Sequence, residues 1–136
     1  MAAPPSRTVL RIETELKDLQ QSPLEFVNNL ETVDDNHYEW KGKMMGPPDT
    51  PYAGKTLEFT ITYTQEYPLR APTFKFITQI DHPNIHSKDG TISLALLQRE
   101  WTPKISMRTI LQGVYSLLVL PDHNTPIEPE KANPKT

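Results

Sequence analysis

Four short runs, all between residues 67 and 103, decide the fold of this sequence. They read Tyr67-Pro68-Leu69-Arg70-Ala71-Pro72, His82-Pro83-Asn84-Ile85, Gly90-Thr91-Ile92-Ser93-Leu94 and Trp101-Thr102-Pro103. From residue 81 to residue 103 the hydrophobic periodicity lapses, and a long ordered stretch without helix or strand pattern is usually functional. This stretch is also rich in side chains that can do chemistry. The functional site is therefore predicted here, with the scaffold on either side of it.

The residues before this region alternate as half-buried strands do. Residues 57–64 have a period of two, with four large side chains on one side of the predicted strand: Leu57, Phe59, Ile61 and Tyr63. Shorter runs at residues 24–27, 37–45 and 73–77 predict three more strands. Because short turns separate the runs, we expect a four-stranded antiparallel meander with one face free for helices.

One helix is predicted on each side of the strands in the sequence. Ser6 is the predicted N-cap of the first, whose apolar stripe follows at spacings of three and four residues: Val9, Ile12, Leu16 and Leu19. Pro23 ends this helix. Ser106 caps the second helix, which presents a broad apolar face until Pro121 stops it. The predicted fold class is α+β, with an N-terminal helix and a second helix packed on the sheet.

Length and composition exclude several classes of protein. The chain has 136 residues, which predicts a single domain over residues 1–136, with residues 1–5 and about 130–136 flexible. It has no cysteine, which excludes a disulfide framework, a thiolate zinc site and a cysteine nucleophile. The net charge is −3 and there is no basic block, which argues against binding to nucleic acid or anionic membranes.

Targeting signals and metal ligands are not predicted either. The N-terminus lacks the pattern of a signal peptide, and the longest apolar stretch, residues 117–120, is too short to span a membrane. We therefore expect a protein of the cytoplasm or nucleus. His82 and His86 invite a zinc hypothesis, but Pro83 lies in the spacer and no third ligand is evident, so no metal or cofactor is predicted. Four aromatic residues are predicted to be core and not a ligand-stacking set: Trp40, Phe59, Phe74 and Phe76.

In this order and spacing, the four runs resemble the ubiquitin-conjugating enzymes. The resemblance covers roughly residues 6–130 and includes both helices, the strand at residues 57–64 and the proline-rich turn at residues 46–52. It implies a four-stranded antiparallel meander flanked by helices, and a transferase that carries its modifier as a thioester. The implied partners are ubiquitin or a ubiquitin-like protein, a ubiquitin-activating enzyme and a ubiquitin ligase.

The resemblance also implies roles for individual residues. Ser93 stands where the family has the cysteine that carries ubiquitin. The side-chain amide of Asn84 is implied to hydrogen-bond the oxyanion formed when a lysine attacks, or to brace the neighbouring loop. His82 is implied to order the local turn and not to act as a base. Thr125 stands where relatives often place the acidic or hydroxyl residue that helps to deprotonate the incoming lysine.

A serine at position 93 changes the chemistry. A free cysteine is a few per cent thiolate at neutral pH, whereas a serine hydroxyl needs a positioned base to become a nucleophile. No Gly-x-Ser-x-Gly motif surrounds Ser93, so a serine-dependent acyl-transfer enzyme is a remote alternative, although His82 or His86 could act as base if the geometry allowed. We expect that the chain as written does not turn over as a ubiquitin carrier.

Two interpretations of Ser93 follow, and we place the first slightly ahead. In the first, serine has replaced cysteine in an otherwise active enzyme, to trap or silence it. The intact His82-Pro83-Asn84 element and the retained Trp101 and Pro103 favour it, because the resemblance implies that naturally inactive relatives often lose the His-Pro-Asn element.

In the second interpretation, the chain is a ubiquitin-conjugating enzyme variant. Such a protein is non-catalytic, binds an active conjugating enzyme as a heterodimer and steers chain linkage. Ala95 favours this interpretation because many active relatives have Asp or Asn there, and so does Thr125. The chain also stops soon after Pro129, as the variants do.

The resemblance further implies a docking surface for the activating enzyme and ligases. Its predicted residues lie on the first helix and on two proline-rich loops: Arg7, Arg11, Leu69, Thr102 and Pro103. A leucine beside proline-stiffened loops makes a good small hydrophobic anchor if it is exposed. The competing hypothesis is that Leu69 packs under its own loop.

Overall fold

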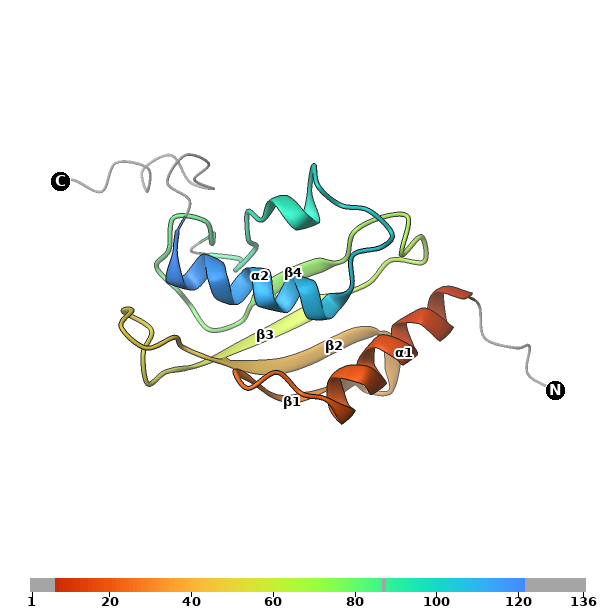
Figure 1. Cartoon of the computed structure of the whole chain (residues 1–136), viewed down its shortest axis with the longest axis horizontal. Helices are drawn as coiled ribbons and strands as arrows, with labels where there is room; N and C mark the ends of the chain where they lie inside the picture. Colours follow the sequence, from red (N-terminus) through yellow and green to blue (C-terminus); the bar gives the residue numbers. More distant parts are fainter. Residues whose placement is uncertain (1–6, 87, 122–136) are drawn as a thin grey trace.

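Two helices and a four-stranded sheet make up the described part of the chain, residues 7–86 and 88–121 of a computed structural model. The elements follow in the order α1 (Arg7–Gln21), β1 (Val27–Val33), β2 (Asn36–Met45), β3 (Thr56–Thr62), β4 (Thr73–Phe76), the 3₁₀ turn η1 (Ala95–Leu97) and α2 (Met107–Val119). All strand pairs are antiparallel, in the order β1-β2-β3-β4 (Figure 1). The predicted α+β meander is confirmed. The predicted cap Ser6 and the predicted flexible ends lie outside the described residues.

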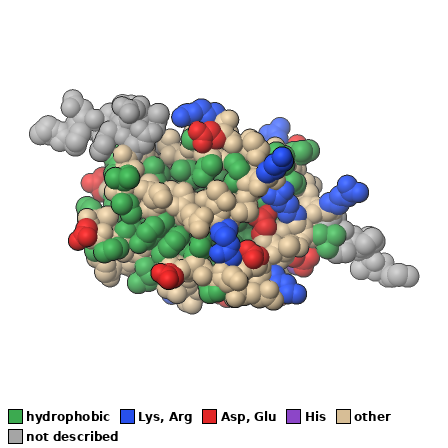
Figure 2. Space-filling view, viewed as in Figure 1, with side chains coloured by type: hydrophobic (Ala, Val, Ile, Leu, Met, Phe, Trp, Pro, Cys, Tyr) green, Lys and Arg blue, Asp and Glu red, His purple; other side chains and the backbone are tan. Residues whose placement is uncertain are grey.

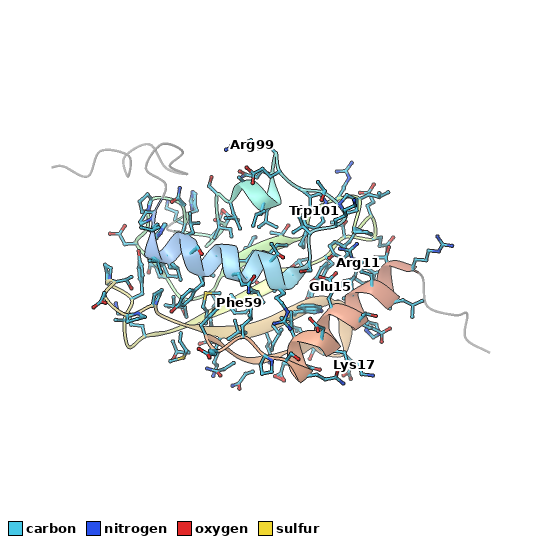
Figure 3. All side chains as sticks on the ribbon, viewed as in Figure 1. Arg11, Glu15, Lys17, Phe59, Arg99 and Trp101 are labelled. Carbon is cyan, nitrogen blue, oxygen red and sulfur yellow. The ribbon has the colours of Figure 1, made fainter. Side chains whose placement is uncertain are left out.

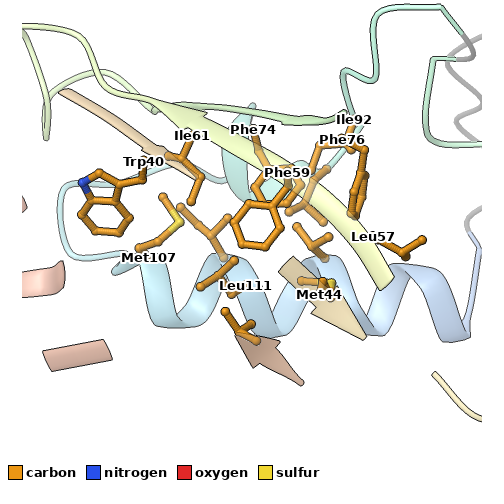
Figure 4. Close-up of a cluster of buried hydrophobic side chains, with 14 of the residues drawn as sticks. Trp40, Met44, Leu57, Phe59, Ile61, Phe74, Phe76, Ile92, Met107 and Leu111 are labelled. Atoms are coloured by element: carbon orange, nitrogen blue, oxygen red, sulfur yellow. The ribbon is translucent and has the colours of Figure 1, made fainter. Parts of the chain in front are cut away.

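The core lies between the inner face of the sheet and α2. The alternating strand pattern holds in β3, where the large side chains at positions 57, 59 and 61 are buried and Glu58 and Thr62 are exposed. Figure 4 shows Met107 and Leu111 of α2 facing the aromatic and aliphatic side chains of the sheet. All four aromatic residues predicted to be core are buried there: Trp40, Phe59, Phe74 and Phe76.

A glycine in the middle of β2 makes room for this core. Gly42 is paired with Phe59 on the inner face of the sheet. A Cβ atom at position 42 would lie 2.8 Å from Cζ of Phe59 and 3.1 Å from Cδ1 of Leu30. Because the first distance is shorter than real Cβ contacts allow, the absence of a side chain at Gly42 lets the Phe59 ring lie across β2.

The first strand differs from the prediction. The run at residues 24–27 was predicted as a strand, but β1 is Val27–Val33. Its pairing with β2 shifts register between Asn28 and Glu31, and Asn29 has a left-handed backbone with φ 56°. Such a bulge inserts an extra residue, so the alternation that marks a strand is lost from the sequence. Pairing with β2 outweighs the poor strand propensity of asparagine.

The second helix begins at its predicted cap, and both helices bury the apolar face that their patterns predict. The Ser106 side chain accepts a hydrogen bond from the Thr109 N–H and so caps α2. On α1 the stripe is buried at Ile12 and Leu19. Within the described residues, neither helix combines the length and the apolar character that a membrane crossing requires.

Candidate functional site

The segment between β4 and α2 folds back on itself and pairs with the edge of the sheet. The His86 N–H donates to the Thr91 carbonyl at 2.8 Å, and the Phe76 N–H donates to the Gly90 carbonyl at 2.9 Å. Gly90 has φ +75°, and a Cβ atom there would lie 1.9 Å from the Phe76 carbonyl oxygen. The close approach to β4 therefore requires glycine at position 90.

This turn brings two of the predicted site residues together. The Ser93 N–H donates to the Asn84 carbonyl at 2.7 Å. Asn84 is fully buried, whereas Ser93 is half-buried and so is accessible to solvent. The 3₁₀ turn η1 begins two residues after Ser93. The residue at position 93 is thus held by its backbone, at a surface, beside a buried asparagine.

The buried side chain of His82 supports this arrangement by contacting two backbone groups. Its side chain is 1% exposed, with Nε2 at 2.8 Å from the Leu117 carbonyl and Nδ1 accepting the Asn84 N–H at 3.0 Å. A carbonyl oxygen only accepts and an N–H only donates, so these contacts assign a neutral imidazole with its proton on Nε2. Both ring nitrogens are therefore engaged by backbone groups, and His82 has no nitrogen positioned to take a proton from Ser93.

The histidine pair does not form a chelating site. His82 uses both nitrogens on the backbone, and His86 Nδ1 accepts the Lys88 N–H at 3.2 Å within the turn. Across residues 7–86 and 88–121 there is no cluster of three His, Cys, Asp or Glu side chains that could hold a metal ion.

Three segments meet at the other end of the molecule: the start of α1, the turn at residues 66–72 and the loop at residues 101–105. The Trp101 indole N–H donates to the Pro68 carbonyl at 3.0 Å, which ties the turn to the loop. Leu69 is 77% exposed and does not pack under its own turn. Three further predicted docking residues are also exposed: Arg7, Thr102 and Pro103. In Figure 2 the Lys and Arg side chains of the visible face gather toward the end where α1 begins.

Sequence reasoning missed one exposed apolar residue of α1. Leu10 lies on α1 and is 50% exposed, because it does not belong to the apolar stripe that faces the core. Its signal in the sequence was a leucine out of phase with the buried positions.

Arg11 lies inward of this surface. Its Nε donates to Glu15 at 3.0 Å, one Nη donates to the Ile105 carbonyl at 3.0 Å, and its guanidinium carbon is 5.2 Å from the centre of the Tyr67 ring. Burial, and then the hydrogen bond to Glu15, raise the pKa of Tyr67, so its hydroxyl stays protonated at neutral pH and donates to Glu15. Figure 3 labels Arg11 and Glu15 on the side of α1 that faces the start of α2. Thr125, the remaining predicted site residue, lies outside the described residues.

Comparison with known proteins gives a consistent result. A family model described as "Ubiquitin-conjugating enzyme" matches residues 11–135. The chain is 36% identical over 123 residues to the Ubiquitin-conjugating enzyme E2 pex4 of Dictyostelium discoideum, a match that covers 90% of this chain and 83% of that protein. It is 36% identical over 126 residues to the Ubiquitin-conjugating enzyme E2 1 of Caenorhabditis elegans, covering 93% of this chain and 63% of that protein, which is less than two thirds of its length.

Solved structures agree with the sequence relatives. The E2 domain of a Toxoplasma gondii ubiquitin conjugating enzyme superposes with a TM-score of 0.83 and is 36% identical, covering 93% of this chain and 84% of that one. Human Ubiquitin-conjugating enzyme E2 G1 gives a TM-score of 0.81 and 35% identity, covering 88% of this chain and 100% of that one.

We predict that His82→Ala lowers the free energy of unfolding by about 2–4 kcal/mol, because it leaves a cavity and removes the partners of the Leu117 carbonyl and the Asn84 N–H. Urea unfolding measures the change. His37→Ala is the matched control, since His37 is exposed on β2, and its effect should stay within about 0.5 kcal/mol. Equal stability of the two variants would show that His82 does not support the turn.

Proposed function

Because the chain belongs to the ubiquitin-conjugating enzyme family, we propose that it acts in the transfer of ubiquitin or a ubiquitin-like protein, with Ser93 at the carrier position. The observation that supports this most directly is the pairing of a half-buried Ser93 with a fully buried Asn84 through a 2.7 Å backbone hydrogen bond. A carrier residue has to meet a large protein partner, so it must be accessible. It also has to lie beside groups that can stabilise the negative charge of acyl transfer.

Asn84 is proposed to serve the reaction from this buried position. An amide N–H that points at developing negative charge lowers the barrier of acyl transfer only if it is held in place beforehand. Asn84 is held by its own backbone, which donates to His82 and accepts from Ser93. His82 in turn is anchored on α2 through the Leu117 carbonyl. This chain of contacts supports a positioning role for His82 and a role for Asn84 in bracing the loop or binding the oxyanion.

The serine is proposed to make the chain as written inactive as a carrier. Transfer requires a nucleophile at position 93 to attack the carbonyl of the modifier's C-terminal thioester and to expel the thiolate of the activating enzyme. A serine hydroxyl does this only with a base beside it, and both nitrogens of His82 and the Nδ1 atom of His86 are already engaged by backbone groups. A cysteine at the same position would supply a thiolate without such a base.

We predict that Ser93→Cys converts the chain into a carrier. Incubation with ubiquitin, ubiquitin-activating enzyme and ATP should give an adduct on a non-reducing gel that disappears with a thiol reductant. Ser22→Cys is the matched control, because Ser22 is an exposed serine just after α1 whose backbone bonds to Asp18 and Arg108, and it should give no adduct. A folded Ser93→Cys protein that never forms the adduct would contradict the carrier role.

A second function is favoured by one observation, the absence of cysteine from the whole chain. A protein that cannot form a thioester can still use the same fold to bind an active conjugating enzyme and steer the linkage of the ubiquitin chain. For this function we predict that the unmodified chain co-elutes from size-exclusion chromatography with an active conjugating enzyme as a one-to-one heterodimer. Failure to co-elute with any enzyme of a panel would count against the role as a non-catalytic partner.

The docking surface for the activating enzyme and ligases is proposed to be the end of the molecule where α1, the 66–72 turn and the 101–105 loop meet. Leu69 of the turn is its proposed anchor. Arg7 of α1 and Thr102 and Pro103 of the loop are further exposed residues that we assign to this surface. What supports this is the 77% exposure of Leu69 on a turn whose base is tied down by Trp101. Rigid presentation of an apolar side chain reduces the entropy lost on binding.

We predict that Leu69→Ala, made together with Ser93→Cys, slows formation of the ubiquitin adduct about tenfold or more, because truncating a hydrophobic anchor weakens binding to the activating enzyme. Ile77→Ala is the matched control, since Ile77 is 61% exposed but follows β4 and lies on none of the three docking segments. Adduct formation is followed by time-course gels at limiting activating enzyme. Equal rates for the two variants would place the docking surface elsewhere.

A further inference from the structure

The carboxylate of Glu15 joins three separate segments of the chain. It accepts a hydrogen bond from Nε of Arg11 on α1, at 3.0 Å, and another from the hydroxyl of Tyr67 in the 66–72 turn. A third hydrogen bond comes from the Met107 N–H at the start of α2, at 2.6 Å. We call Glu15, Arg11, Tyr67 and Met107 the Glu15 junction. No local sequence pattern marks these contacts, because the Tyr67 and Met107 partners of Glu15 lie 52 and 92 residues away along the chain.

The Glu15 carboxylate and the Tyr67 ring at the centre of the junction are largely shielded from solvent, which strengthens their contacts. The Glu15 side chain is only 12% exposed and Tyr67 is fully buried. A charged group that is shielded from water must be paired, and hydrogen bonds to a carboxylate are roughly twice as strong as neutral ones. The Met107 N–H is also one of the first-turn donors that α2 cannot satisfy internally, and negative charge is favourable at that end of a helix.

Further contacts extend from the junction to the proposed docking surface. The Thr8 hydroxyl donates to the Tyr67 carbonyl at 2.7 Å, and Trp101 donates to the next carbonyl, that of Pro68. Arg11 donates to the carbonyl of Ile105 in the adjacent loop. Figure 3 shows Trp101 on the same side of the molecule as Arg11 and Glu15. The exposed Leu69 is only two residues beyond Tyr67, so the position of its turn depends on these bonds.

A second ionic contact between the helices provides a comparison. Arg108 of α2 donates to the Asp18 carboxylate at 2.9 Å and to the Ser22 carbonyl at 2.7 Å. This contact also joins α1 to α2, but none of its hydrogen bonds reaches the 66–72 turn or the 101–105 loop. The two carboxylates therefore separate two effects. The contact of Asp18 joins only the two helices, whereas the contacts of Glu15 join the helices and also reach the turn.

We propose that Glu15 is a positioning residue for partner binding: through Tyr67, Arg11 and Met107 it holds the turn of Leu69, the loop of Pro103 and the start of α1 in one fixed arrangement. The proposal rests on the docking function proposed above and assigns a residue that sets the geometry of that surface. Glu15 touches no partner itself. Its effect is to present the exposed side chains together, so that a partner binds a preformed surface.

The test compares Glu15→Gln with Asp18→Asn, each combined with Ser93→Cys. A glutamine oxygen can still accept the Met107 N–H, but its NH₂ group cannot accept from Arg11 or Tyr67. We expect Glu15→Gln to weaken binding to the activating enzyme about tenfold, and Asp18→Asn to leave it within about twofold. Affinity is measured by titration with labelled protein. Backbone hydrogen exchange at residues 66–72 should become faster in Glu15→Gln only.

Each other outcome bears on the proposal. Unchanged affinity in Glu15→Gln, or an equal loss in Asp18→Asn, would overturn it, as would weaker binding with unchanged exchange at residues 66–72. If Glu15→Gln does not fold, Tyr67→Phe keeps the ring and removes only the hydroxyl bond, and it should show the same effects in weaker form. If the parent protein does not bind the activating enzyme at all, the docking function fails, while the exchange comparison still tests whether Glu15 holds the turn.

Discussion

The N–H groups of the first turn of a helix and the carbonyls of its last turn need partners from outside the helix. In α2 both ends obtain them from distant side chains: Glu15 accepts the Met107 N–H, and His82 donates to the Leu117 carbonyl. Much of the structure depends on this pair of contacts, because α2 packs its buried face into the core beside the sheet. One end of α2 is thereby tied to the proposed docking surface and the other to the loop of Ser93.

This arrangement explains how the fold can be kept when residue 93 is serine and not the cysteine of the family. The contact that positions residue 93 is a backbone hydrogen bond to Asn84, and it does not involve the side chain at position 93. Serine and cysteine differ by one atom, so either fits the same loop. The fold and the family match are therefore insensitive to the residue that decides the chemistry, which is why the carrier and the variant share one structure.

The two proposed functions make different demands on the same molecule. A carrier needs position 93 to be accessible and reactive, whereas a non-catalytic partner needs only its surfaces. The half-buried Ser93 and the exposed Leu69 lie on different loops, and each loop is held by its own set of hydrogen bonds. The proposed docking surface can consequently persist when the reaction is lost.

The sequence by itself determined the strands of β2, β3 and β4, the cap of α2, the aromatic core and the family, because alternation, capping and motif spacing are local patterns. It did not determine the β1 bulge, the exposure of Leu10, the inward position of Arg11 or the bonds of His82. Only the tertiary structure decided the role of Glu15, whose partners come from residues 67 and 107. A hydrogen bond depends on distance in space, and no pattern along the chain records which segments meet.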